Sequence, residues 1–221
     1  MPRRSIPIVK NEIYHVVNRT IGGYPIFNND RNCRRFIDVI NYYRVNKPPI
    51  RYSKYLLLNE KDKAYSDTLL NSLPKTTDIL CFCLMPNHFH LLIKLLSDDS
   101  VNDYVRKISN SISRYINLKR NRRGPLFQSR FRCVHIEDTD QLLHVSRYIH
   151  LNPYSSGIVK SKEELLKYPY SSFNEYLSNP RIYQTDLVIK QFNNVKLYKK
   201  FVLNHADYQR SIQKYKYLYL N

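Results

Sequence analysis

Residues 84–93 have the sequence LMPNHFHLLI, in which a Pro-Asn turn leads two histidines into an apolar segment. Because successive side chains of an extended strand point to opposite faces, His88 and His90 share one face and the apolar side chains beside them share the other. Two imidazoles on one face of a rigid strand can bind a single metal ion. A histidine in a half-buried strand is also often only a hydrogen-bonded residue, so the pair alone leaves both interpretations open.

The sequence around the histidine pair predicts further strands. Residues 79–84 and 88–95 are rich in β-favouring residues on either side of the turn, and residues 11–18 predict a first strand with His15 and Val17 on one face. The region from 44 to 78 is interpreted as an excursion from the main fold. Its apolar residues 55–58 predict a short strand, followed by a polar loop over 59–63 and a short helix over 64–73.

Amphipathic spacing and capping residues predict the main helices. Asp30 is expected to cap a helix that runs to about residue 43, and Ser100, with Asp103 three residues later, is expected to open a long helix. Asp138 is expected to start another helix, which ends at Asn152 because a residue before proline disfavours the helical region. Two more amphipathic helices are expected in the basic C-terminal extension, residues 179–221.

The composition indicates a folded protein with a polyanionic partner. The chain has 221 residues, of which 43% are hydrophobic, and its formal net charge is +18. Nucleic acid is the commonest partner of such a basic domain. Codon bias could raise the lysine content, but arginine is equally common and is clustered. No apolar run is long enough to span a bilayer and the N-terminus lacks the apolar core of a signal peptide, so a cytoplasmic location is expected.

Residues 119–136 form a basic segment in which arginines alternate with aromatic residues. A charged run is usually a solvated loop, but aromatic interleaving favours single-stranded nucleic acid, whose phosphates attract Arg and Lys and whose bases stack on rings. The candidate DNA contacts in and around this segment are Arg114, Lys119, Arg120, Arg122, Arg123, Phe127, Gln128, Arg130, Arg132 and Arg147. His15, Arg19 and His144 are candidate accessory residues.

The four cysteines are expected to be reduced and mostly buried. An alternative is a structural zinc site formed by Cys81, Cys83, His88 and His90. The intervals between these residues are not those of common zinc modules, and Cys81 lies within an apolar strand.

The helix that follows the basic segment carries a second group of polar residues. His144, Tyr148 and Asn152 are spaced by four and can lie on one helix face. A tyrosine there is usually a packing residue. A phenol has a pKa near ~10 and is a weak nucleophile, so a metal ion held by the two histidines would help it attack a phosphate. The amide oxygen of Asn152 is a reasonable third ligand, which would leave positions open for substrate.

Several motifs together resemble a known family. Residues 85–92 resemble the HUH motif (His, hydrophobic, His) of single-tyrosine transposases, and residues 147–153, RYIHLNP, resemble the tyrosine helix of the REP-associated tyrosine transposases. Residues 14–19, 124–131 and 168–172 match further family motifs in the family's order. Compared with the family, Phe127 stands where a tryptophan is frequent.

The resemblance implies an α+β, ferredoxin-like domain over residues 1–178, with the HUH strand at the centre of an antiparallel sheet and an insertion near 44–78. It implies cleavage of single-stranded DNA near hairpins, with Mg²⁺ or Mn²⁺ as cofactor and a 5′-phosphotyrosine intermediate. Tyr148 would be the nucleophile, and His88, His90 and Asn152 the metal ligands. The alternative is a non-catalytic nucleic-acid-binding module on the same fold. The target sequence, a mobile or domesticated role, and a monomeric or homodimeric state stay open.

Overall fold

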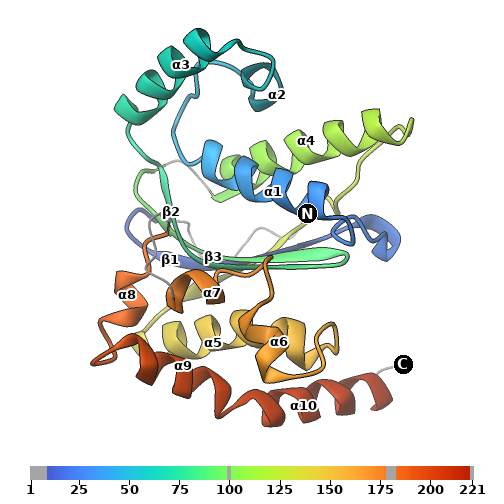
Figure 1. Cartoon of the computed structure of the whole chain (residues 1–221), viewed down its shortest axis with the longest axis vertical. Helices are drawn as coiled ribbons and strands as arrows, with labels where there is room; N and C mark the ends of the chain where they lie inside the picture. The colour runs from blue at the N-terminus through green and yellow to red at the C-terminus, as the bar shows by residue number, and fades with distance from the viewer. Residues whose placement is uncertain (1–8, 99–100, 178–182, 220–221) are drawn as a thin grey trace.

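A four-stranded antiparallel sheet with helices on both faces forms the centre of the computed structural model (Figure 1), which describes residues 9–98, 101–177 and 183–219. The strands are β1 (Ile13–Arg19), β2 (Thr77–Met85), β3 (His88–Leu95) and β4 (Arg132–Ile136). Their spatial order is β2-β3-β1-β4, with β3 paired to both β2 and β1. The predicted turn and histidine-bearing strand are confirmed, and the strand lies in the interior of the sheet.

Two helices on one face complete a β-α-β-β-α-β connection. They are α1 (Asp30–Tyr42), between β1 and β2, and α4 (Val101–Lys119), between β3 and β4. With the observed strand order, this connection defines a ferredoxin-like fold, so the predicted α+β class with a central antiparallel sheet is confirmed. The opposite face of the sheet is covered by α5 (Thr139–Ser155) (Figure 1).

The alternation of side chains along the strands creates two hydrophobic cores. Phe89, Leu91 and Ile93 of β3 are fully buried in the core beneath α1 and α4. Leu92 points the other way, into the core shared with Ile149 of α5. This period-two pattern also directs His88 and His90 toward the α5 side of the sheet.

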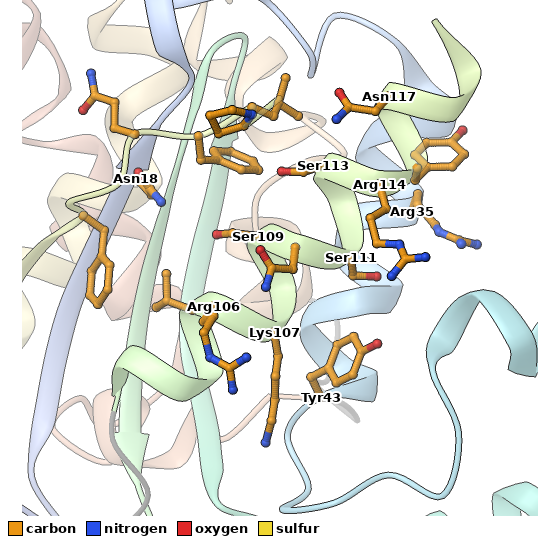
Figure 2. A pocket seen from close by; sticks show the side chains of 18 of the residues that line it. Asn18, Arg35, Tyr43, Arg106, Lys107, Ser109, Ser111, Ser113, Arg114 and Asn117 are labelled. Carbon is orange, nitrogen blue, oxygen red and sulfur yellow. The ribbon is translucent and has the colours of Figure 1, made fainter. Parts of the chain in front are cut away.

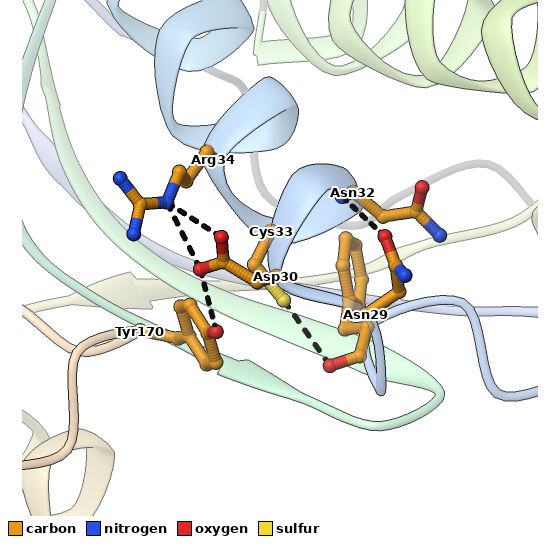
Figure 3. A network of polar contacts seen from close by, with 7 residues as sticks. Asn29, Asp30, Asn32, Cys33, Arg34 and Tyr170 are labelled. Carbon is orange, nitrogen blue, oxygen red and sulfur yellow. Dashed lines mark hydrogen bonds and ion pairs between the residues drawn. The ribbon is translucent and has the colours of Figure 1, made fainter.

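The exposed edge of β2 is covered by residues 168–172, one of the motifs noted above. The Leu84 amide donates to the Tyr170 carbonyl at 2.8 Å, and the Ser172 amide donates to the Phe82 carbonyl at 3.0 Å. The Tyr170 hydroxyl also donates to Asp30 at the start of α1 (Figure 3). The segment therefore satisfies an edge that would otherwise be free to pair with another chain.

The capping predictions have mixed outcomes. Asp138 caps α5 as predicted, since its carboxylate accepts from the Gln141 amide at 2.7 Å. The prediction for Asp30 was wrong, because Asn29 caps α1 and accepts from the Asn32 amide (Figure 3). Asp30 is instead in the first turn of α1, where its carboxylate pairs with Arg34 and accepts from the Tyr170 hydroxyl. Ser100 lies outside the described residues.

The predicted end of the tyrosine helix at Asn152 was wrong, because α5 continues through Pro153 to Ser155. A proline removes one N–H donor and disfavours helix at the preceding residue. Here the following turn is closed by the Ser156 amide, which donates to the Asn152 carbonyl at 3.0 Å. Burial of Tyr154 and Ser155 stabilises this last turn, so tertiary packing overrides the local preference.

The region from 44 to 78 is helical and lies beyond α1, away from the sheet (Figure 1). The predicted strand over 55–58 was wrong, because α2 (Tyr52–Tyr55) ends there and Leu57 is 79% exposed, with no strand beside it. The predicted loop over 59–63 was also wrong. The helix α3 (Glu60–Ser72) begins earlier because Asn59 caps it and accepts from the Asp62 amide at 2.9 Å.

The helices that follow α5 lie on the α5 side of the sheet (Figure 1). They are α6 (Lys162–Leu166), α7 (Phe173–Leu177), α8 (Asp186–Ile189), α9 (Val195–Leu203) and α10 (Ala206–Tyr219). A short 3-10 helix, η1 (Ile21–Gly23), follows β1. The described part of the extension thus has three helices, where two were predicted, because the short α8 carries too few residues for an amphipathic pattern. Tyr198 and Val202 of α9 are buried in the α5 core. No helix in the described ranges is both long and apolar enough to cross a membrane.

Candidate active site

A basic cavity of about 420 Å³ lies between the sheet and α5. Its walls come from β1, β3, the end of the basic segment and α5, and they consist of His15, Val17, Arg19, His90, Gln128, Arg130, Arg132 and Tyr148. The lining thus combines three arginines with no carboxylate. Such a cavity attracts an anionic group such as a phosphate.

His90 presents an unused ring nitrogen to this side of the sheet. Its Nε2 atom is buried and has no hydrogen-bond partner in the described part of the chain. Its Nδ1 atom lies 3.0 Å from His15 Nε2, and the two rings stack at 5.3 Å between centroids. If Nδ1 donates to His15, His90 Nε2 carries a lone pair and can bind a metal ion.

His88, two residues before His90 on β3, also has its Nδ1 atom in a hydrogen bond. Its Nδ1 atom lies 2.7 Å from the side-chain oxygen of Asn87, which can only accept, so His88 Nδ1 donates. The lone pair of His88 is therefore on Nε2 as well. The two rings are 5.1 Å apart between centroids, as expected for a same-face pair on one strand.

Burial keeps these imidazoles neutral. Desolvation, helped by the positive charge of Arg132, lowers the pKa of His15 to about 4. Desolvation and Arg19 lower the pKa of His88 to about 4, and desolvation also lowers the pKa of the buried His90 well below its usual value. A neutral imidazole is the form that binds a metal ion.

Tyr148 lies directly over the histidines. Its ring centroid is 5.7 Å from that of His90 and 6.2 Å from that of His15, both in edge-on geometry. The side chain is 37% exposed, so the ring packs against the site while part of it faces solvent. Burial raises the pKa of the phenol, whereas the charges of Arg19 and Arg132 act in the opposite direction. Tyr148 therefore lies beside His15 and His90 of its own chain.

Asn152 lies one turn after Tyr148 on α5. Its side-chain nitrogen donates to the Tyr148 carbonyl at 2.9 Å, which leaves the amide oxygen as the atom that could contact a cation. Asn152 is 5% exposed and is not part of the cavity lining, so its role as a metal ligand stays a prediction.

The zinc alternative was wrong for this conformation. Among residues 9–98, 101–177 and 183–219, no three His, Cys, Asp or Glu side chains gather as a metal-binding group. Cys81 and Cys83 are fully buried, and desolvation raises the pKa of both thiols. A pair of histidines with an amide oxygen is a different donor set, to which this finding does not apply.

Two predicted residues of the tyrosine helix lie elsewhere. His144 is exposed and does not line the cavity, so its accessory role stays a prediction. The Arg147 guanidinium lies 4.3 Å from the centre of the Phe201 ring of α9. Because Arg147 is one residue before Tyr148, a helix of 3.6 residues per turn directs its side chain away from the Tyr148 face and toward the C-terminal helices.

The basic segment divides into parts with different surroundings. Gln128, Arg130 and Arg132 reach the cavity beside Tyr148. The predicted stacking residue Phe127 is only 5% exposed and packs edge-on against Phe89, so its ring supports the segment and does not offer a face to a base. The Arg120 guanidinium lies over the ring of Tyr24.

Four more of the candidate DNA contacts lie outside the cavity lining. Arg114 and Lys119 line a larger groove on the other side of the sheet (Figure 2). Arg122 donates to Asn117 at 2.8 Å, and Arg123 is exposed.

The sequence analysis missed two residues that contact the site. Asn87 orients His88, and its position in the Pro-Asn turn could have suggested this role. Gln209 of α10 donates to the Tyr148 carbonyl at 3.2 Å. This contact joins residues 61 positions apart, so no local pattern predicts it.

Comparison with known proteins shows a similarity to transposases. Residues 51–152 match the family described as IS200-like transposase. The chain is 29% identical over 127 residues to a protein of Haemophilus influenzae named as a REP-associated tyrosine transposase, covering 53% of this chain and 69% of that protein. The predicted resemblance to this family is confirmed.

A solved structure shows the same fold. It is the structure of a REP-associated tyrosine transposase bound to a REP hairpin, with a TM-score of 0.56 and 18% sequence identity. The match covers 84% of this chain and 90% of the other. At 18% sequence identity, this similarity supports the fold alone.

Proposed function

We propose that the chain is a metal-dependent transesterase that cleaves single-stranded DNA near hairpins, with Tyr148 as the nucleophile. The observation that carries the proposal is the position of the Tyr148 ring, 5.7 Å from that of His90, whose buried Nε2 atom has no hydrogen-bond partner among the described residues. A packing tyrosine does not require an unsatisfied imidazole beneath it. The similarity to IS200-like transposases supports the same interpretation.

The proposed reaction exchanges one phosphate ester for another. The Tyr148 hydroxyl oxygen forms a bond to phosphorus, and the bond from phosphorus to the 3′ oxygen breaks. The phenolic proton leaves Tyr148, and a proton is taken up by the departing oxygen, which becomes a free 3′ hydroxyl. The products are a 5′-phosphotyrosine adduct and a DNA end that can reverse the reaction.

The charges of Arg19 and Arg132 assist the attack of Tyr148 on the phosphate. Both arginines line the cavity, and their charges favour the ionised form of Tyr148. The same charges stabilise the negative charge that accumulates on phosphate oxygens during the attack. Arg130 extends the basic surface along the path of the backbone.

The proposed donor atoms are of types that a divalent cation can bind. His88 and His90 each have Nδ1 placed to donate, which leaves two Nε2 lone pairs, and Asn152 offers an amide oxygen. Mg²⁺ or Mn²⁺ bound there would polarise the phosphate as a Lewis acid. Two imidazoles favour Mn²⁺ over Mg²⁺, because Mg²⁺ prefers an all-oxygen environment.

The test is formation of a covalent protein–DNA adduct. The purified chain is incubated with hairpin-bearing single strands and Mn²⁺ or Mg²⁺, and protein-bound DNA is separated on a denaturing gel. A label on the 3′ side of the cut is expected to stay with the protein, and a 5′ label is expected to be released.

The matched variants are Tyr148→Phe and Tyr154→Phe, which remove a hydroxyl from the same helix. The Tyr154 hydroxyl donates to Asp207, away from the cavity, so this control is expected to keep adduct formation while Tyr148→Phe abolishes it. An adduct that persists in Tyr148→Phe would refute the nucleophile assignment. DNA binding that survives chelation, without cleavage of any hairpin tried, would favour the non-catalytic binding module.

A further inference from the structure

A groove of about 1240 Å³ lies on the face of the sheet opposite Tyr148, between β1, the polar side of α4 and residues 124–131 (Figure 2). Six basic side chains and no carboxylate line it. Arg114 on its rim is exposed and has no carboxylate partner in the described parts of the chain. This distribution of charge fits a second stretch of polyanion.

Within the described ranges, three buried side-chain atoms of the groove lack hydrogen-bond partners, namely Arg35 Nε and two oxygens. Asn18 of β1 is 4% exposed, and its side-chain oxygen makes no hydrogen bond within the described ranges. The same holds for the hydroxyl of Ser109 on α4, which lines the groove beside it (Figure 2). Leaving a buried acceptor unpaired is costly, so such atoms persist where a ligand can satisfy them.

The groove and the Tyr148 cavity meet at the end of β1. Asn18 and Arg19 are consecutive strand residues, so their side chains point to opposite faces, one into the groove and the other into the cavity. Gln128 lines both the groove and the cavity, and its backbone N–H donates to the Arg19 carbonyl at 2.8 Å. A single strand could therefore pass from one face of the sheet to the other at Gln128.

We propose that this groove binds unpaired nucleotides of the same strand that Tyr148 is proposed to cleave, and that Asn18 reads a base edge there. The inference rests on the proposed function for the identity of the strand. A paired base cannot reach an acceptor that is covered at the floor of a groove, whereas an unstacked base can enter edge first. The arginines and lysines of the rim bind the backbone.

The chemistry of the amide specifies the base. An asparagine side chain can accept from the N6 amino group of adenine and donate to its N7 atom. The carboxylate of an aspartate at the same place would instead accept from the N4 amino group of cytosine. Ser109 can serve as a further donor or acceptor to either base.

The test measures base preference in the absence of divalent metal. Fluorescein-labelled homopolymers of dA, dC and dT are titrated with the full chain, and binding is followed by fluorescence anisotropy. The wild-type chain is expected to bind dA about fivefold or more tightly than dC and dT, and Asn18→Ala to lose this preference. Asn18→Asp is expected to shift the preference toward dC.

Two controls keep the result interpretable. Asn41→Ala removes another amide whose oxygen is buried and unpaired, on α1 and outside the groove, and is expected to keep the preference for dA. Arg114→Gln changes an exposed rim residue and is expected to weaken binding of all three homopolymers equally.

Equal binding of the three homopolymers by the wild-type chain, or a preference that persists in Asn18→Ala, would overturn the inference. If the Tyr148 adduct forms while either of these results is obtained, the proposed function stands and only the inference about the groove fails. A preference that depends on Asn18, with no adduct on any hairpin substrate, would instead support the groove and refute the proposed cleavage.

Discussion

At the scale of single residues, the contact between His15 and His90 has a specific role in this account. The 3.0 Å bond between their ring nitrogens holds His90 with Nε2 facing the site. We expect His15→Phe to weaken Mn²⁺ binding by roughly 10 to 100-fold, as loss of an orienting partner usually does. Calorimetric titration of Mn²⁺ into each protein would measure the change.

A matched variant separates this role from a general effect of losing a histidine. His135 of β4 pairs with Glu12 at 2.7 Å and lies outside the cavity lining, so His135→Gln is expected to leave Mn²⁺ affinity unchanged. Equal affinities of the wild-type chain and His15→Phe would show that His15 does not orient a ligand.

At the scale of single elements, α5 is held by the C-terminal helices. Gln209 of α10 donates to the Tyr148 carbonyl and to the Ser155 hydroxyl, both at 3.2 Å. We expect Gln209→Ala to slow adduct formation severalfold while single-strand binding is kept, because the positioning of Tyr148 is loosened and the basic surface is unchanged. Single-turnover rates and anisotropy would be measured together. An unchanged rate would mean that packing of the helices alone holds α5 in place.

The buried His150 links α5 to its neighbours and makes stability depend on pH. Its ring nitrogens contact Tyr198 Oη at 2.7 Å and Ser172 Oγ at 2.9 Å, and burial lowers its pKa from 6.5 to about 3. Between these values the unfolded state binds a proton that the folded state rejects. The stabilisation is therefore complete above pH ~6.5 and is lost as the pH falls toward ~3.

A replacement of His150 should remove part of this dependence. We expect the wild-type chain to lose about 2 to 3 kcal/mol more unfolding free energy than His150→Gln between pH 7 and pH 4.5. Urea unfolding of both proteins at the two pH values measures the difference, and the other buried histidines contribute equally to each protein. Parallel losses would contradict a neutral, desolvated His150.

At the scale of the whole molecule, basic side chains line both the Tyr148 cavity and the groove on the other face of the sheet. Binding of single strands should fall steeply with salt, because neutralised phosphates release counterions. We expect Arg130→Gln to reduce the slope of log affinity against log salt by about 0.7. Arg34, which pairs with Asp30 outside both linings, is the matched control, and Arg34→Gln is expected to keep the slope. Equal reductions in both variants would indicate attraction by net charge alone.

The sequence predicted what depends on local patterns and missed what depends on distant packing. Alternation along residues 88–95 places His88 and His90 on one face, and the helical repeat brings Asn152 beside Tyr148. The burial of Phe127 could not be predicted, because it depends on a core formed by β3 and α1. Residues 168–172 pair with the edge of β2, which is far away in sequence, so this contact could not be predicted either.

The most direct test of the central claim is mass spectrometry of the protein–DNA adduct after proteolysis. The account predicts that the peptide containing Tyr148 carries a nucleotide through its 5′ phosphate, and that the adduct requires Mn²⁺ or Mg²⁺. A nucleotide attached to any other residue, or a DNA strand cleaved without a covalent protein adduct, would contradict Tyr148 as the nucleophile of this site.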